Sequence, residues 1–230
     1  MDFATLGDTI MQGILLGGLY ALFATGLALV FGVMRLVNLA HGDLIILSAY
    51  AALAAAAATG LSIIAAFPLV VIVMAAFGYA LQRGLFNFVL SGDDVLRPLL
   101  VTFGLSIVIE NALLEAFSAD TQHIIVGPLN TASVEVAPGL IAGVLPLISL
   151  VVAVVVLGAL QFMLYRTQLG RMFRATSDDA EIASAMGVQT ARIFGQASAI
   201  AFGVIAIAGL MLRSEEHTSE LQSQSTISYA

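Results

Sequence analysis

The stretch RTQLGRMFR (residues 166–174) carries three of the chain's eight arginines and lies between two long apolar runs. The chain has no lysine, and four further arginines also border apolar runs: Arg35, Arg83, Arg97 and Arg192. If the runs cross a bilayer in chain order, these seven arginines fall on one side of it. Lys and Arg are retained on the cytoplasmic side of membrane proteins. The pattern therefore predicts a polytopic membrane protein whose longest cytoplasmic loop covers residues 166–192.

The composition agrees with this interpretation. Of the 230 residues, 60% are hydrophobic and only 10% are charged, whereas a soluble domain carries about 25% charged residues. The apolar runs are about 20 residues long, which is enough for an α-helix to cross about 30 Å of hydrocarbon. They are also too continuous for the strands of a barrel. We therefore expect an all-α, polytopic membrane helix bundle with about six transmembrane helices. The predicted spans are residues 9–33, 44–59, 63–82, 99–117, 140–165 and 193–212, and residues 118–139 form the main external loop.

Several classes of function are disfavoured. The formal net charge is −7, so no basic patch is expected that would displace counterions from a nucleic acid. Cysteine is absent, which excludes disulfides and thiolate metal sites. Asp2 and Asp8 precede or begin the first apolar run without a positive charge, and a cleaved signal peptide would have the opposite pattern. We find no phosphate-binding glycine loop, so any ATP would be bound by a separate chain.

Small residues recur every four positions in the first and last spans, and such stripes allow helices to pack closely. These residues are Gly13, Gly17, Ala21 and Thr25 in the first span, and Gly195, Ala199 and Gly203 in the last.

The composition changes abruptly at Arg213. Residues 213–230 are polar and serine-rich without apolar periodicity, which is typical of a disordered terminus. The segment also resembles the translation of sequencing-adapter DNA. We therefore expect residues 1–212 to form the membrane domain and residues 213–230 to be a non-native, disordered tail.

The hexapeptide NLAHGD (residues 38–43) places polar groups between the first two spans. Polar residues that enter a bilayer must be paired or must line a wet cavity. One interpretation is a discontinuous helix, broken at Gly42, in which Asn38, His41 and Asp43 border a translocation path. The other is an ordinary polar loop in which His41 and Asp43 satisfy helix ends. The composition leaves both open.

Glu110 and Asn111 lie near the middle of the fourth span. A charged residue at the centre of a span costs about 2.5 to 3.5 kcal/mol on insertion. Glu110 could therefore lie on a substrate or proton path, or it could be protonated or bonded to another helix. Glu115 is closer to the outer end, where it can reach the interface.

The long cytoplasmic loop predicts a short amphipathic helix. Asp178 and Glu181 have the spacing of a capping box, with Asp179 in the first turn. Ile182 and Met186 would share one apolar face, and glycine at 187 would end the helix. The acids favour docking to a protein over an anionic membrane surface. The residues expected at this surface are Arg171, Arg174, Asp178, Asp179, Glu181, Ala183 and Gly187.

Five motifs carry a family resemblance. They are GGLYAL with the following GL (residues 17–22 and 26–27), NLAHG (38–42), TFGLS (102–106), GRMFRA (170–175) and ASAMG (183–187). Through them, residues 13–212 resemble the membrane permease of a branched-chain amino acid ABC importer of the LivH type, whose relatives also move urea and short amides. The ASAMG stretch resembles the coupling loop, whose short helix sits in a cleft of the ATP-binding subunit.

The resemblance implies a transport protein of the bacterial inner membrane. Its partners would be a second permease subunit, two ATP-binding subunits, a periplasmic substrate-binding protein and the lipid bilayer. ATP would be bound by those partners, and no cofactor by this chain. Family members usually have glutamine where Glu110 stands, and they continue with two or three further helices, so we expect a truncated permease. The rival hypotheses are a proton-coupled carrier driven by Glu110 and an intramembrane enzyme in which His41, Asp43 and Glu110 converge.

Overall fold

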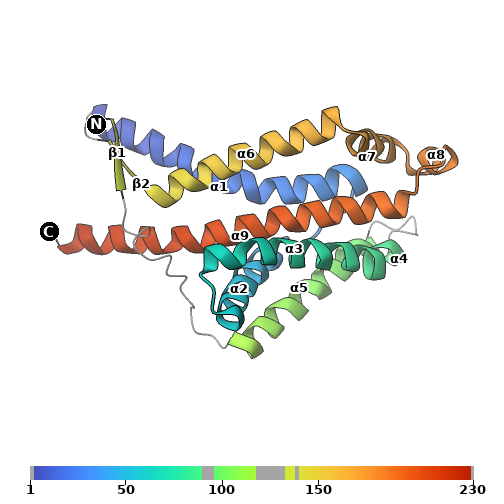
Figure 1. Cartoon of the computed structure of the whole chain (residues 1–230), viewed down its shortest axis with the longest axis horizontal. Helices are drawn as coiled ribbons and strands as arrows, with labels where there is room; N and C mark the ends of the chain where they lie inside the picture. The colour runs from blue at the N-terminus through green and yellow to red at the C-terminus, as the bar shows by residue number, and fades with distance from the viewer. Residues whose placement is uncertain (1–2, 90–95, 118–132, 138–139, 229–230) are drawn as a thin grey trace.

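Helix α9 (Thr190–Ser228) is the central element of the bundle. Figure 1 shows it running the length of the molecule, with α1 (Phe3–Met34) and α6 (Val144–Arg166) on one side and α2 (His41–Thr59) and α3 (Ile63–Leu81) on the other. Sixty-seven per cent of its apolar part is buried, against 11% for α6. The computed structural model describes residues 3–89, 96–117, 133–137 and 140–228.

Within these residues, six helices are long and apolar enough to cross a membrane. This confirms the predicted all-α membrane bundle. The candidate spans are Leu6–Met34, His41–Thr59, Ala65–Phe86, Leu96–Phe117, Val144–Arg166 and Thr190–Leu212. The third of them joins α3 to a π-helical turn, η1 (Gln82–Phe86), which leads into α4 (Asn87–Val89).

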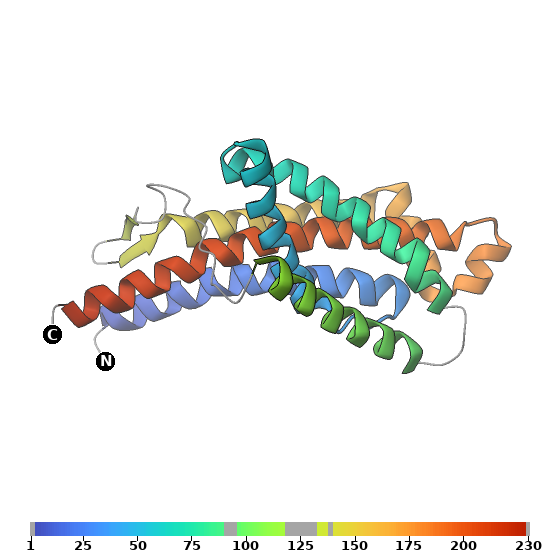
Figure 2. The ribbon, with the colours of Figure 1, turned by 90° about the horizontal axis from the view of Figure 1, so that it is seen from below.

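The segments that carry the seven arginines expected on one side of the membrane lie at one end of the bundle. Figure 1 and Figure 2 show the end of α1, α4, the end of α6 and the start of α9 at one end of the bundle, together with α7 (Gln168–Asp178) and α8 (Ala180–Ala185). Arg35 directly follows α1, and Arg97 lies in the first turn of α5 (Leu96–Phe117). By the positive-inside rule this is the cytoplasmic end, and the name is used below.

The boundary of the fifth span was predicted wrongly. Residues 140–143 form a strand, β2 (Leu140–Gly143), which pairs antiparallel with β1 (Ser133–Ala137), and α6 begins only at Val144. The backbone of Gly143 is extended, with ψ 140°, and proline at 146 is tolerated because it lies in the first helical turn. The alternating valines of SVEVA also suit a strand. Of the predicted external loop, residues 118–132 and 138–139 lie outside the described residues.

The last segment also differs from the sequence-based expectation. The backbone of α9 is helical to Ser228, although residues 213–230 were expected to be disordered. Extending a helix that is already formed needs no new nucleus, and the Glu, Leu and Gln residues in this segment favour helix. The non-native origin of the segment stays a prediction.

The small residues of α9 allow close packing, as predicted. A side-chain carbon added at Gly195 would lie 2.7 Å from the ring of Tyr79 in α3. Closer still, one added at Gly209 would overlap the hydroxyl of Ser48 and the carbonyl of Ile45 in α2. At Gly203 the nearest atom of another helix would be 3.8 Å away, which is ordinary contact.

The corresponding prediction for α1 is wrong at Gly13 and Gly17. A side-chain carbon added at either glycine meets nothing within 4 Å among the described residues. The close approach of α1 to α6 falls at Gly18 instead, where an added carbon would lie 2.8 Å from Leu150. The small residue that packs on α6 is therefore Gly18 and not a member of the predicted stripe.

Gly209→Ala should lower the thermal stability of the purified protein, because the added methyl group overpacks the contact between α9 and α2. The expected cost is about 1 to 3 kcal/mol. Gly203→Ala is the matched control. It has room for the methyl group, and alanine favours a helix by about 1 kcal/mol, so stability should be unchanged or raised. Thermal unfolding in detergent, followed by circular dichroism, separates the two, and equal losses would contradict the close packing at Gly209.

Candidate translocation and coupling site

The chain turns back into the bundle between α1 and α2. The ring of His41, at the start of α2, lies 2.8 Å through Nε2 from the carbonyl oxygen of Phe23. Since a carbonyl can only accept, Nε2 carries the proton and donates. Phe23 lies three turns before the end of α1 at Met34, which is about 16 Å along the axis at about 1.5 Å per residue. His41 therefore lies about half the depth of the hydrocarbon away from the cytoplasmic end.

The return loop, residues 35–40, provides its own hydrogen bonds. Asn38 is buried, and its Oδ1 accepts from the backbone N–H of Ala40 at 3.1 Å. Its backbone carbonyl also accepts from the N–H of His41 at 3.3 Å. Irregular backbone at membrane depth is tolerated only where protein or a cavity surrounds it, and this Asx turn meets that condition. The break between the helices thus covers residues 35–40, before His41, and the predicted break at Gly42 is wrong because Gly42 is inside α2.

Asp43 connects α2 to α5. It lies in the first turn of α2, where the helix dipole favours a negative charge. Its carboxylate accepts a hydrogen bond from the hydroxyl of Ser106. Ser106 ends the TFGLS motif, and sequence reasoning quoted that motif without assigning the serine a partner.

Glu110 and Asn111 lie on the outer side of α5. Both are exposed, and the amide of Asn111 donates to the carbonyl of Ile107 in its own helix at 2.7 Å. Glu110 is one turn beyond Ser106, but it is exposed, whereas Ser106 is half-buried and bonds Asp43 of α2. In the described part of the chain, no hydrogen bond joins Glu110 to His41 or Asp43, and no group of three His, Cys, Asp or Glu side chains could hold a metal. The convergence that an intramembrane enzyme requires is not found there.

Two short helices occupy the cytoplasmic end, and the first of them, α7, was not predicted. Thr167 caps it, because its hydroxyl accepts from the N–H of Gly170 at 3.2 Å. A side-chain carbon at Gly170 would collide with the backbone carbonyls of Met163 and Leu164 in α6. Only glycine therefore allows the sharp turn between α6 and α7. The signal was present in the sequence as a threonine followed three residues later by glycine.

The second short helix, α8, is the predicted amphipathic helix with its start moved by one residue. Asp178 was expected to be the N-cap, but it is the last residue of α7, and Asp179 is the cap. Oδ1 of Asp179 accepts from the N–H groups of Glu181 and Ile182, both at 2.9 Å. The N-cap of α8 is Asp179 and not Asp178 because Asp178 is the last residue of α7, a helix that was not predicted.

The predicted end of α8 is confirmed. Gly187 has φ 89°, in the left-handed region that favours glycine. Its N–H donates to the carbonyl of Ser184 at 2.9 Å, and the N–H of Val188 donates to that of Ala183 at 3.0 Å, which is the Schellman pattern.

The two ends fix the orientation of α8 side chains. Ala183 is buried at 5% exposure, whereas Ile182 and Met186 are 64% and 81% exposed. The predicted apolar face therefore projects from the bundle.

The arginines of α7 point in different directions. Arg171 is exposed. Arg174 turns back toward α6, where its Nη1 donates to the carbonyl of Leu164 and its guanidinium stacks on Tyr165, 5.5 Å from the ring centroid. Sequence reasoning had placed both arginines at the coupling surface, and the structure places Arg174 at the side of the bundle.

Helix α7 is fastened to the cytoplasmic end of α1. The hydroxyl of Ser177 donates to the carbonyl of Gly32, and Nη2 of Arg35 donates to the carbonyl of Ser177 at 3.4 Å. Arg35 itself has φ 52°, which is uncommon for a residue other than glycine. Helix α1 therefore contacts α7 at its cytoplasmic end and His41 about three turns deeper.

Over residues 9–228, the sequence matches the family described as "Branched-chain amino acid transport system / permease component". The chain belongs to this family. Among its relatives is the high-affinity branched-chain amino acid transport system permease protein BraD of Pseudomonas aeruginosa, 27% identical over 215 residues that make up 88% of this chain and 69% of the relative. LivH of Salmonella typhimurium, with the same description, is 27% identical over 212 residues, 87% of this chain and 68% of the relative. LivH of Escherichia coli K12 gives 27% over 217 residues, with the same shares. No solved structure matches the chain.

Membership of this permease family confirms the resemblance seen in the motifs. The family consists of transporter permeases rather than enzymes, and six candidate spans make the chain a multi-pass membrane protein. The match also covers residues 213–228, which sequence reasoning had excluded from the permease.

Ser106→Ala should destabilise this permease, because the Asp43 carboxylate loses a donor at membrane depth. An unsatisfied buried acceptor costs about 1 to 3 kcal/mol. In a double-mutant cycle, Ser106→Ala should cost less when Asp43→Ala is already present, with a coupling of about 0.5 to 3 kcal/mol. Unfolding in mixed micelles measures the cycle.

Asn111→Ala is the control for this cycle, because Asn111 bonds only to the backbone of its own helix in the structure. Its effect should simply add to that of Asp43→Ala. If Ser106→Ala were equally additive, the hydrogen bond between α2 and α5 would contribute nothing to stability.

Proposed function

We propose that this chain is the membrane-spanning permease subunit of an ABC importer for branched-chain amino acids in a bacterial inner membrane. Its partners are a second permease subunit, which is a copy or a paralogue, two ATP-binding subunits and a periplasmic substrate-binding protein. ATP is bound by the partners and no cofactor by this chain. Family membership over residues 9–228 is the observation that carries the proposal.

The cytoplasmic unit of α7 and α8 supports the assignment of ATP-driven partners. Helix α8 is held at both ends, by the Asp179 cap and by the left-handed Gly187, and it presents Ile182 and Met186 outside the bundle. Two exposed apolar side chains on a short, rigid helix suit insertion into a cleft of a partner protein. Arg171, Asp178 and Glu181 surround them with charge that can select that partner.

The return loop supports a translocation path along α2 and α5. Asn38, His41 and Asp43 place polar groups at membrane depth, and Glu110 with Asn111 continue polar character along the outer side of α5. A mid-depth carboxylate facing lipid is costly, so this side of α5 is covered by the second permease subunit or lines the path. A mostly apolar path with few polar groups suits substrates with hydrocarbon side chains.

Asp179→Ala should uncouple ATP hydrolysis from uptake while the permease stays in the membrane. Loss of an N-cap costs a helix about 1 kcal/mol. Helix α8 should therefore fray and bind the ATP-binding subunit less tightly. Gly187→Pro should do the same more strongly, because proline cannot adopt φ 89°. ATPase activity and uptake are measured together in proteoliposomes.

Asp178→Ala is the comparison that tests the cap assignment, because Asp178 belongs to α7. It should retain several-fold more coupled uptake than Asp179→Ala. A greater loss in Asp178→Ala would show that α8 begins where the sequence alone suggested. Normal uptake in both Asp179→Ala and Gly187→Pro would remove the coupling role of α8.

Labelled leucine should be taken up by the assembled transporter at the expense of ATP. Excess isoleucine or valine should compete strongly, because they share its branched hydrocarbon side chain, whereas urea and acetamide should not. Competition by urea or acetamide would instead favour a carrier of short amides. Uptake that persists without the ATP-binding subunits and collapses with the proton gradient would indicate a secondary carrier.

A further inference from the structure

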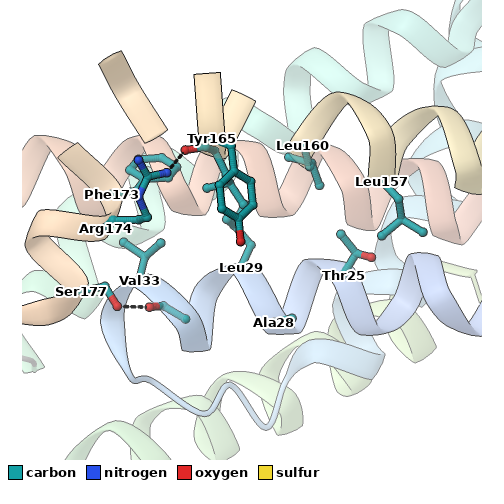
Figure 3. A pocket seen from close by; sticks show the side chains of 12 residues that line it. Thr25, Ala28, Leu29, Val33, Leu157, Leu160, Tyr165, Phe173, Arg174 and Ser177 are labelled. Carbon is teal, nitrogen blue, oxygen red and sulfur yellow. Dashed lines mark hydrogen bonds between the residues drawn. The ribbon is translucent and has the colours of Figure 1, made fainter. Parts of the chain in front are cut away.

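A groove between α1 and α6 opens on the side of the bundle, next to α7. Its volume is about 350 Å³. Figure 3 shows Thr25 and Leu157 at one end of the groove, and Phe173, Arg174 and Ser177 at the other. The ring of Tyr165 lies between these two groups. The groove lies between two helices that are long and apolar enough to span the membrane, and it ends at α7. It is separate from the return loop and from the exposed face of α8.

The chemistry of the groove changes along its length. At membrane depth its walls are apolar, formed by residues such as Ala28, Leu157 and Leu160. At the cytoplasmic end Arg174 is the only charged residue among the described residues that line it. Nη1 of Arg174 donates one hydrogen bond to the carbonyl of Leu164, and the guanidinium has five N–H donors in all. The remaining donors are available to an anion at the level where Tyr residues commonly meet lipid headgroups.

We propose that this groove binds one anionic phospholipid of the inner leaflet. The phosphate of the headgroup accepts hydrogen bonds from Arg174, and one acyl chain lies along Ala28, Leu157 and Leu160. A groove that opens into a bilayer at this depth is filled by hydrocarbon, and the planar guanidinium suits bidentate phosphate binding. Basic sites between membrane helices on the cytoplasmic side attract anionic headgroups.

The contacts of Arg174 favour a lipid over a protein helix as the occupant. Its guanidinium is held at the groove by Leu164 and by the ring of Tyr165, and Tyr165 itself is 68% exposed. A transmembrane helix packed there would bury a guanidinium against apolar side chains and would need an acid of its own to pair with it. An anionic headgroup brings the charge and the hydrocarbon in one molecule.

The test is the binding of defined lipids to the purified chain in detergent, measured by native mass spectrometry. Phosphatidylglycerol and phosphatidylcholine with identical acyl chains are titrated in parallel. Wild-type protein should bind phosphatidylglycerol roughly fivefold more tightly, the effect expected of one Arg near an anionic surface. Arg174→Gln should abolish the preference without abolishing phosphatidylcholine binding, and Arg174→Lys should keep part of it. Glycerol phosphate, which lacks acyl chains, should not displace the lipid.

Two controls match these variants in charge and volume. Arg192→Gln removes one exposed arginine from the same end of the bundle but outside the groove, and it should keep the preference. Ala28→Phe fills the groove and should weaken both lipids, whereas Ala58→Phe, on the exposed end of α2, should weaken neither.

Three results would overturn the proposal. They are equal binding of both lipids to the wild type, an equal loss of preference in Arg192→Gln, and displacement of the lipid by glycerol phosphate alone. If no lipid binds and Arg174→Gln instead releases another transporter subunit on purification, the groove is a protein interface.

Discussion

The absence of water in the hydrocarbon layer is the constraint on which this fold depends. Every polar group that enters the membrane must find its partner within the protein, and the chain brings in an irregular loop between α1 and α2. Within that loop the side chain of Asn38 accepts from the N–H of Ala40, and the ring of His41, which follows the loop, donates to the carbonyl of Phe23. Without these bonds the loop would have to stay at the interface. The loop also brings the start of α2 to this depth, where Asp43 accepts a hydrogen bond from Ser106 of α5.

The spans and their orientation could be predicted from the sequence because both depend on properties that are local in the chain. Hydrocarbon thickness sets the length of an apolar run, and arginine marks the end that stays in the cytoplasm. The left-handed Gly187 was predictable for the same reason. Helix α7 was missed because its register depends on the collision-free turn at Gly170, and the cap of α8 moved from Asp178 to Asp179 as a result. The strand at Leu140 was missed because its partner lies in a segment read as a loop.

The candidate site could be predicted only in part. Polar residues at membrane depth stand out in a sequence, so Asn38, His41 and Asp43 were identified, but their partners lie far along the chain. Ser106 is 63 residues from Asp43, and nothing local to either residue indicates the pairing. The stripe in α1 shows the same limit, since spacing predicts that a helix has a small-residue face but not which neighbour covers it. Gly18 packs on α6, whereas Gly13 and Gly17 contact nothing nearby among the described residues.

Helix α1 is the element through which the two ends of the proposed transporter can communicate. At its cytoplasmic end the carbonyl of Gly32 accepts a hydrogen bond from the Ser177 hydroxyl of α7, and Arg35, which directly follows α1, donates to the Ser177 carbonyl. About three turns deeper α1 carries the hydrogen bond to His41. Helix α1 thus contacts α7 through Ser177 and the start of α2 through His41, so a displacement of α7 would act on the same helix that holds His41. The left-handed Arg35 lies where the chain leaves α1 for the return loop, so the one positive-φ residue other than glycine in the described residues also donates a hydrogen bond to Ser177 of α7.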